Sequence, residues 1–333
     1  MTRGFFNSIQ HFPEYDNAEK SWHITLDRSD FFWYDLVVKP PSEDAGKALK
    51  KHLNDFKKFV ELNNEKRFIY FFTSRKKVRF DIKKQPSFLM FSKKKMYVHL
   101  LIGNKVKKKV GICFPYDIPG KVVVDEKFIY LYDENGNSIA YSVHDFLKIC
   151  KINLGLDSEL LYVGITEDPV ERTLGRKHRG LTDILYNVPT SENDIFLTIN
   201  TFKVGSYTNL KNNYINIMST NSMIYDIPLD KEGLVIEKAL IYYFKSEFQE
   251  IDKKAWGEFR NLLAMMKEKK NICSVSFHLE LNEPTEYDVI GSKDVKPRIS
   301  HSFLWQLNNN EPSLMIFNNE IEIMKYQGVL SDI

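Results

Sequence analysis

The feature that most constrains the fold is a series of short aromatic and β-branched runs between Phe68 and Tyr132, separated by Lys, Pro, Gly and Asn. Such runs, when turn residues bound them, are typical of strands, and their close spacing favours hairpin connections. The sequence therefore predicts a mostly antiparallel β domain. The runs are Phe68–Phe72, Val78–Ile82, Phe88–Phe91, Tyr97–Ile102, Val110–Phe114, Val122–Val124 and Phe128–Tyr132.

One helix is expected ahead of these strands. From Ser42 to about Lys66, apolar residues recur at helical spacing behind an acidic first turn, and the other face is rich in lysine. A turn near Glu134 to Gly136 marks a candidate boundary. Residues 1–136 are therefore predicted to form a basic, β-rich domain with one helix, which binds nucleic acid or another partner.

Beyond that turn, helical and strand patterns alternate, which is typical of an α/β domain. We expect residues 137–252 to form this domain and residues 253–333 to add a helix and further strands, so the chain as a whole is α+β. The polar stretch that begins at Ser206 and extends to about residue 229 is interpreted as an insertion. The expected helices are 143–151, 169–186, 230–248 and 253–269, and the expected strands are 160–165, 195–204, 275–281 and two near residues 303 and 315.

Composition narrows the class of protein. No apolar run approaches the roughly 18 residues of a membrane span, and the first residues lack a signal-peptide core. Cys113, Cys150 and Cys273 are odd in number and far apart, which favours neither a disulfide framework nor a thiolate zinc site. We therefore expect a cytoplasmic protein without a membrane partner.

Charge is distributed unevenly along the chain. Between Arg75 and Lys109 there are 13 lysines and arginines and one acid, Asp81, a local charge of +12; the formal net charge is +3, so the other residues carry −9. A local excess of this size is typical of a surface that binds a polyanion, although lysines also protect exposed strand edges. The candidate phosphate contacts are Lys93, Lys94, Lys95, Lys107, Lys108 and Lys109.

One carboxylate is predicted in an unusual place. Leu234, Glu237, Ile241, Phe244 and Phe248 follow helical spacing, which puts Glu237 in the apolar stripe of its helix. A carboxylate that leaves water needs a partner such as a metal, an arginine or several donors. The sequence leaves open whether Glu237 is a metal ligand or half of a structural ion pair.

A set of residues around Glu237 resembles the GIY-YIG nuclease superfamily. The set begins with Tyr162-Val163-Gly164 on a strand, continues through an acidic turn into a helix with Arg172, and ends with the helix that carries Glu237 and leads to Gln249. The resemblance covers residues from about 150 to 250. Within it, Gly164 and Gln249 are expected to support the site.

The resemblance implies a compact α/β fold that cuts phosphodiester bonds with Mg²⁺ or Mn²⁺. The hydroxyl of Tyr162 would act on the attacking water, Arg172 would stabilise charge on the phosphate, and Glu237 would bind the metal beside the leaving oxygen. These roles suit the residues, because a metal lowers the pKa of bound water and arginine grips phosphate oxygens with a planar fork. Arg176, one turn after Arg172, is expected to contact a phosphate.

The first triplet of the family name is not found where the resemblance would place it. Ile149-Cys150-Lys151 stands there instead, so the first tyrosine is missing. Tyr141, His144 or His178 could supply a second general base, because neutral imidazole is suited to that role near pH 7. The sequence does not choose among the three, and His178 is a candidate catalytic residue.

Two hypotheses for function follow. The first is a metal-dependent endonuclease that acts on DNA in restriction or anti-phage defence, with the basic N-terminal half holding the duplex and with a second copy or another defence protein as a partner. The alternative is an inactive GIY-YIG-like module that binds nucleic acid or protein, consistent with the missing triplet. An RNA-cleaving enzyme is a third reading of the same residues, and its substrate distinguishes it.

Overall fold

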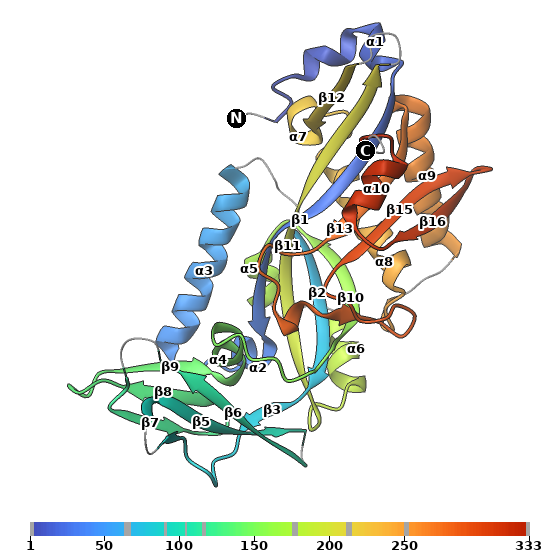
Figure 1. The fold of residues 1–333 in the computed structure, drawn as a ribbon. Helices are drawn as coiled ribbons and strands as arrows, with labels where there is room; N and C mark the ends of the chain where they lie inside the picture. The colour runs from blue at the N-terminus through green and yellow to red at the C-terminus, as the bar shows by residue number, and fades with distance from the viewer. Residues whose placement is uncertain are drawn as a thin grey trace.

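The protein is described by a computed structural model that covers residues 3–62, 68–89, 92–103, 105–114, 118–174, 179–210, 215–249 and 253–330, without the side chains of residues 62, 92, 93, 172, 179–181, 183, 215 and 253. It is a mixed α+β protein, as expected. One large sheet runs through its centre, with helices beside it and a smaller β region at one end (Figure 1). In the part of the chain covered by the model, no helix is both long and apolar enough to cross a membrane.

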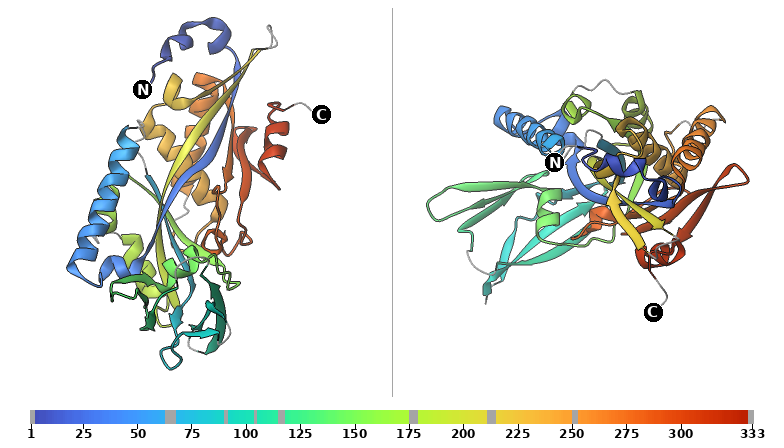
Figure 2. Two further views of the ribbon diagram at one scale, coloured as in Figure 1. Left: turned by 60° about the vertical axis from the view of Figure 1, so that its left-hand side comes forward. Right: turned by 90° about the horizontal axis from the view of Figure 1, so that it is seen from above.

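The central sheet has the strand order β14-β10-β2-β11-β1-β13-β15-β16, with β12 paired to β11. Its neighbours are antiparallel, except that β13 runs parallel to β1 and β14 parallel to β10. The long strands β1 and β11 are paired along most of their length and join the two ends of the molecule (Figure 2). The strands are β1 (Glu19–Trp33), β2 (Phe68–Lys76), β10 (Ser158–Thr166), β11 (Asn193–Leu210), β12 (Ile215–Thr220), β13 (Ile272–Leu279), β14 (Ile290–Gly291), β15 (His301–Asn308) and β16 (Glu311–Phe317).

This sheet corrects the predicted division into domains. It hydrogen-bonds β1 and β2 from residues 1–136, β10 to β12 from residues 137–252, and β13 to β16 from residues 253–333. The expected boundaries near residues 136 and 252 therefore do not separate the sheet into independent parts. Hydrophobic patterns along the chain identify strands, but they do not identify which strands pair.

The segment between β2 and β10 forms a β module, which we define as β3 to β9 and α4. Its strands pair antiparallel throughout, as predicted for this region, with β3 to β6 in one sheet and β7 to β9 in a second. The turn at residues 134–136 connects β8 to β9 and is not a domain boundary. The elements are β3 (Val78–Phe80), β4 (Ser87–Leu89), β5 (Ser92–Ile102), β6 (Val106–Cys113), β7 (Lys121–Val124), β8 (Phe128–Tyr132), β9 (Ser138–Ser142) and α4 (Val143–Ile149).

Helices cover both faces of the central sheet (Figures 1 and 2). On β2, Ile69 and Phe71 pack into the cluster formed with α8 (Leu229–Phe244) and α9 (Lys253–Lys270). Tyr70 and Phe72 pack into the cluster on the other face, with α3 (Glu43–Leu62), α5 (Pro169–Leu174) and α6 (Arg179–Asn187). Because both faces are buried, β2 is apolar without alternation. The short helices are η1 (Asn7–His11), α1 (Pro13–Asp16), α2 (Tyr34–Val38), α7 (Asn221–Ile224), η2 (Glu286–Asp288) and α10 (Glu320–Tyr326).

The helix expected over 169–186 is described as α5 and α6, with residues 175–178 outside the described part. Two other predictions need correction. The helix expected to reach Phe248 ends at Phe244, where Lys245 adopts a left-handed φ of 48°. The stretch interpreted as an insertion, 206–229, instead contributes the end of β11, then β12 and α7.

Candidate functional site

Two tyrosines stack on neighbouring strands of the central sheet. In the antiparallel pair of β2 and β10, Tyr70 lies opposite Gly164 and Phe72 opposite Tyr162. The ring centroids of Tyr70 and Tyr162 are 6.0 Å apart, and the ring planes are 20° from parallel. Tyr70 is 1% exposed, whereas Tyr162 is half-buried. The β module separates the two strands in sequence, and sheet pairing brings the tyrosines together.

Gly164 is required by this arrangement. A Cβ atom at position 164 would lie 2.2 Å from the hydroxyl oxygen of Tyr70. Only glycine allows the Tyr70 side chain to cross the neighbouring strand this closely. Gly164 therefore supports the tyrosine pair by making room for it.

Sequence reasoning missed Tyr70. The expected position of the first triplet, Ile149-Cys150-Lys151, falls at the end of α4 and in the turn after it, so it forms no strand. Phe68-Ile69-Tyr70 keeps the isoleucine and tyrosine of that triplet, and its Tyr70 lies opposite Gly164 of the Tyr162-Val163-Gly164 strand. The isoleucine and tyrosine lie in the first predicted strand, Phe68–Phe72. The β module is inserted between this strand and Tyr162, so the two are far apart along the chain.

The acidic turn before α5 caps that helix and joins it to α3. The Asp168 carboxylate accepts hydrogen bonds from the backbone N–H groups of Val170 and Glu171, which cap the N-terminus of α5. Its other oxygen lies 2.6 Å from the Lys57 ammonium on α3. The bond from Lys57 and the backbone donors lower the pKa of Asp168. This turn positions the helix that carries Arg172.

The other residues expected on this helical segment cannot be placed. Arg172 belongs to α5, but its side chain lies outside the described residues. Arg176 and His178 lie outside them entirely. Their predicted roles therefore stay predictions.

Gln249 contacts β10 through its side chain. The Val163 N–H donates to Gln249 Oε1 at 3.0 Å, and the Phe248 N–H donates to the Leu161 carbonyl oxygen at 3.3 Å. The segment after α8 thus covers the free edge of β10 and satisfies its backbone groups. This contact gives the expected supporting residue a structural role.

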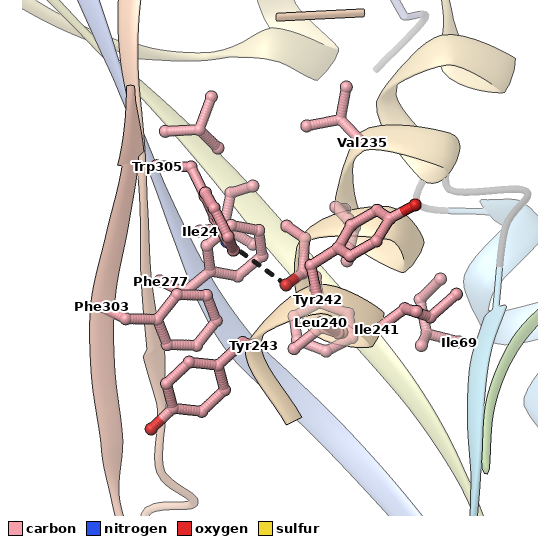
Figure 3. Packing of buried hydrophobic residues seen from close by; sticks show 14 of the residues in the cluster. Ile24, Ile69, Val235, Leu240, Ile241, Tyr242, Tyr243, Phe277, Phe303 and Trp305 are labelled. Atoms are coloured by element: carbon pink, nitrogen blue, oxygen red, sulfur yellow. Dashed lines mark hydrogen bonds between the residues drawn. The ribbon is translucent and has the colours of Figure 1, made fainter. Parts of the chain in front are cut away.

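Glu237 lies on α8 but not at the centre of the buried stripe predicted for it. Leu234 and Glu237 are half-buried, whereas the residues packed most closely include Val235, Leu240 and Tyr243. Figure 3 shows α8 residues against Phe277, Phe303 and Trp305 of the sheet. The buried face of α8 is therefore rotated around the helix axis relative to the stripe predicted from the sequence.

The carboxylate that α8 does bury is Glu232, in its first turn. Glu232 is 4% exposed and accepts hydrogen bonds from Arg3 and from the Asn221 side chain. Burial raises its pKa, and the Arg3 charge opposes that change. The sequence predicted that Glu237 loses the favourable hydration of its carboxylate on folding. In the structure, it is Glu232 that loses it.

Tyr162 and α8 belong to different clusters of the core. Leu161 and Tyr162 pack with the α3 cluster, whereas Leu160 and Val163 pack with the α8 cluster on the other face of β10. The buried hydrophobic residues of α8, from Val235 to Phe244, all belong to that second cluster. A site that joins Tyr162 to Glu237 would therefore have to extend around the edge of β10.

Comparison with known proteins does not assign this chain to a family. No protein-family model, curated protein or solved structure matches this chain. The site therefore rests on its own geometry.

The carboxylates, histidines and cysteines that the structure describes include no group of three or more that could hold a metal ion. Mg²⁺ is usually held through one or two carboxylates together with substrate phosphates and water. Glu237 therefore belongs to no closed metal site among the described residues.

His144 is engaged in a structural network and is not a candidate base. Its Nδ1 lies 2.9 Å from the Tyr287 hydroxyl and its Nε2 lies 3.1 Å from Asp194. His144 is fully buried, and this burial lowers its pKa, although Asp194 opposes the shift. Arg79 binds both Asp194 oxygens at 2.8 Å. These contacts join the β module to β11 and η2.

The basic segment divides into buried and exposed charges. Arg75 pairs with Glu286, and Arg79 with Asp194, both acids from the later part of the chain. Lys108 also turns inward, where its ammonium donates to the Leu154 carbonyl oxygen at 3.0 Å. The expectation that Lys108 contacts a phosphate is therefore not supported by its position.

The other candidate phosphate contacts lie at the surface of the β module. Lys94, Lys107 and Lys109 are exposed, and Lys95 is half-buried. The side chain of Lys93 lies outside the described residues. Lys95, Lys107 and Lys109 share the outer face of the β5–β6 pair, because they occupy alternate positions in its register.

Proposed function

We propose that the chain is a metal-dependent endonuclease of the GIY-YIG type that hydrolyses phosphodiester bonds of DNA. The observation that carries the proposal is the antiparallel pairing of β2 with β10, in which Tyr70 lies opposite Gly164 and its ring stacks on that of Tyr162. The elements that follow, α5 with Arg172, then β11, then α8 with Glu237, keep the order implied by the resemblance.

In this proposal the two tyrosine hydroxyls handle protons around the attacking water, and Tyr70 takes the place of the missing first tyrosine. Arg172 stabilises charge on the phosphate through its planar fork. A divalent cation held by Glu237 and by substrate oxygens would offset charge at the leaving oxygen. The acidic turn at Asp168 orients α5, and Gly164 keeps Tyr70 close to Tyr162.

The β module supplies affinity in this proposal. Its exposed lysines would neutralise backbone phosphates without reading sequence, since phosphate contacts position a protein and base contacts specify the site. A role in restriction or anti-phage defence, in the cytoplasm and with a partner defence protein or a second copy, extends the proposal by analogy with nucleases of this kind.

A second candidate is an inactive module of the same fold that binds nucleic acid or protein. It is favoured by the burial of Tyr70, which is 1% exposed and belongs to the same buried cluster as Leu53 and Phe56 of α3. A hydroxyl buried in this way reaches solvent or substrate only if the packing around it opens. The two candidates therefore differ in whether the Tyr70 hydroxyl becomes accessible.

Incubation of supercoiled plasmid with the full-length protein and Mg²⁺ or Mn²⁺ tests the proposal. Metal-dependent nicking that EDTA stops and that Glu237→Gln abolishes would support the endonuclease. Binding without nicking in either metal would favour the inactive module. A structured RNA incubated in parallel separates DNA cleavage from RNA cleavage.

A further inference from the structure

The outer face of the β module combines cations with an aromatic ring. We define this outer face by Ser87 of β4, by Lys95, Tyr97 and His99 of β5, and by Lys107, Lys109 and Gly111 of β6, which alternate with core residues in the strand register. Ser87, Lys107, Lys109 and Gly111 are exposed. The opposite face of the same strands, with Met96, Val98 and Leu100, is buried in the core of the module. The outer face is thus a solvated sheet surface at the end of the molecule away from α9 (Figure 1).

Tyr97 lies at the centre of this outer face. A Cβ atom at Gly111 would lie 3.2 Å from the Tyr97 ring, so the ring leans over the glycine of the neighbouring strand. The Lys109 ammonium lies 3.9 Å from the ring centroid and the Lys95 ammonium 5.5 Å from it. The ring is therefore held in place by the strand below it and flanked by two flexible cations.

The charge around Tyr97 is strongly positive. Lys84 and Lys109 act electrostatically on His99, and both oppose its protonation. The nearby acid, Asp81, is 2% exposed and lies 3.7 Å from the Lys107 ammonium. This ion pair offsets part of the Lys107 charge, so the positive charge that a ligand would meet comes mainly from Lys84, Lys95 and Lys109.

We propose that this outer face binds a single strand of nucleic acid, with a base stacked on Tyr97 and with Lys95, Lys107 and Lys109 on the flanking phosphates. The proposal rests on the proposed function for the choice of nucleic acid as the ligand. A positive groove with an aromatic ring is the usual way in which proteins hold single strands without regard to sequence.

The position of Tyr97 favours a single strand over a duplex. Bases in a duplex present only their edges, because their faces are covered by the next base pair, whereas unpaired bases can stack on a side chain. An exposed cation–π contact is weaker than base stacking, so a base can displace the Lys109 ammonium from the ring. The displaced ammonium is then free to contact the phosphate of the same nucleotide.

Binding in EDTA tests the proposal independently of cleavage. Fluorescence anisotropy of the full-length protein would compare a labelled mixed-sequence single strand with the same strand annealed to its complement. Tyr97→Val, which keeps a strand-forming residue, should weaken single-strand binding by roughly 5- to 150-fold and leave duplex binding unchanged. Tyr97→Phe, the matched control, should bind like the wild type because it keeps the ring.

Changes to the lysines test the electrostatic part. Single-strand affinity should fall with salt, and Lys107→Gln combined with Lys109→Gln should make this fall less steep. The slope of log affinity against log salt concentration should decrease in magnitude by about 0.7 for each lost contact. If Tyr97→Val does not fold, as judged by its thermal melt, Tyr97→Leu takes its place, because leucine still covers Gly111 and lacks an aromatic face.

Three results would overturn the proposal. They are unchanged single-strand affinity on removal of the ring, an equal loss on single strand and duplex, and displacement of the single strand by polyglutamate as effectively as by unlabelled strand. Failure of the endonuclease would look different, since plasmid would stay intact while the binding results in EDTA held.

Discussion

The Tyr70 and Tyr162 rings stack at 6.0 Å across β2 and β10, two strands between which the whole β module is inserted. The close approach depends on Gly164, because any side chain there would collide with the Tyr70 hydroxyl. The candidate site is therefore assembled from two distant parts of the sequence by strand pairing.

Removing either tyrosine hydroxyl should impair cleavage. If the hydroxyls handle protons, Tyr70→Phe and Tyr162→Phe should each slow plasmid nicking by about 10²-fold or more. The rings and their packing stay, so the melting temperature should change little. Tyr186→Phe is the control, since Tyr186 is 89% exposed on α6. Full activity in both site variants would exclude the tyrosines from the reaction.

The two glutamates of α8 should behave oppositely. Glu237→Gln should abolish metal-dependent nicking with little loss of stability, because Glu237 is only half-buried. Glu232→Gln should reduce the free energy of unfolding by about 1–3 kcal/mol, since it removes the charge that Arg3 and Asn221 bind. Urea unfolding and nicking assays on both variants measure the difference. A large loss of stability in Glu237→Gln, with nicking retained, would instead make Glu237 a structural residue.

The packing of α3 over the tyrosine face can be measured with two phenylalanines of that helix. Phe56 is 2% exposed and contacts Phe68 edge-on at 5.4 Å, whereas Phe59 is 48% exposed. Phe56→Ala should therefore lower the free energy of unfolding by about 3–5 kcal/mol. Phe59→Ala should cost much less, and equal effects in chemical denaturation would contradict the position of α3.

Stability should fall with acid partly because of His301. Its Nε2 lies 2.8 Å from the Ile290 carbonyl oxygen, its Nδ1 lies 2.9 Å from the Tyr243 hydroxyl, and burial lowers its pKa to about 4. The unfolded chain, with an ordinary histidine pKa of about 6.5, then binds more protons between these values. This contribution is present above about pH 6.5 and is lost as pH falls toward 4, by up to about 3 kcal/mol.

Denaturant unfolding at several pH values measures the contribution of His301. His301→Gln should flatten the fall in stability between pH 6.5 and 4 relative to the wild type. His52→Gln is the control, because His52 is exposed on α3. His23 and His144 also have lowered pKa values, chiefly through burial, so part of the slope should persist in the variant. An unaltered slope in His301→Gln would refute the assignment.

Binding at the outer face should strengthen at lower pH. Burial lowers the pKa of His99, Lys84 and Lys109 lower it further, and Asp81 opposes them. A phosphate bound beside these cations would offset their charge and raise the pKa of His99, so that binding takes up a proton. Single-strand affinity should therefore rise as pH falls from 8 to 6, and His99→Gln should reduce this rise. The same pH dependence in both proteins would exclude His99 from the surface that binds the ligand.

Local elements were predictable because their signals are local. The amphipathic pattern after Ser42 predicted α3, and the acidic turn at Glu167 and Asp168 predicted the start of α5, which Asp168 caps. The aromatic runs after Phe68 predicted the antiparallel β module. The long strand β1 was not predicted, since its residues alternate little between buried and exposed positions over its second half.

The sequence by itself determined the strand that carries Tyr162, the helix that carries Glu237 and the basic character of the β module, because periodicity and charge are properties of neighbouring residues. Only the tertiary structure decided that Tyr70 is the neighbour of Tyr162, that Arg75 and Arg79 turn inward to distant acids, and that α8 buries Glu232 more deeply than Glu237. Each of these depends on which strands pair and which helix face meets the sheet. Such choices are made by burial of apolar surface across the whole chain, and no local pattern encodes them.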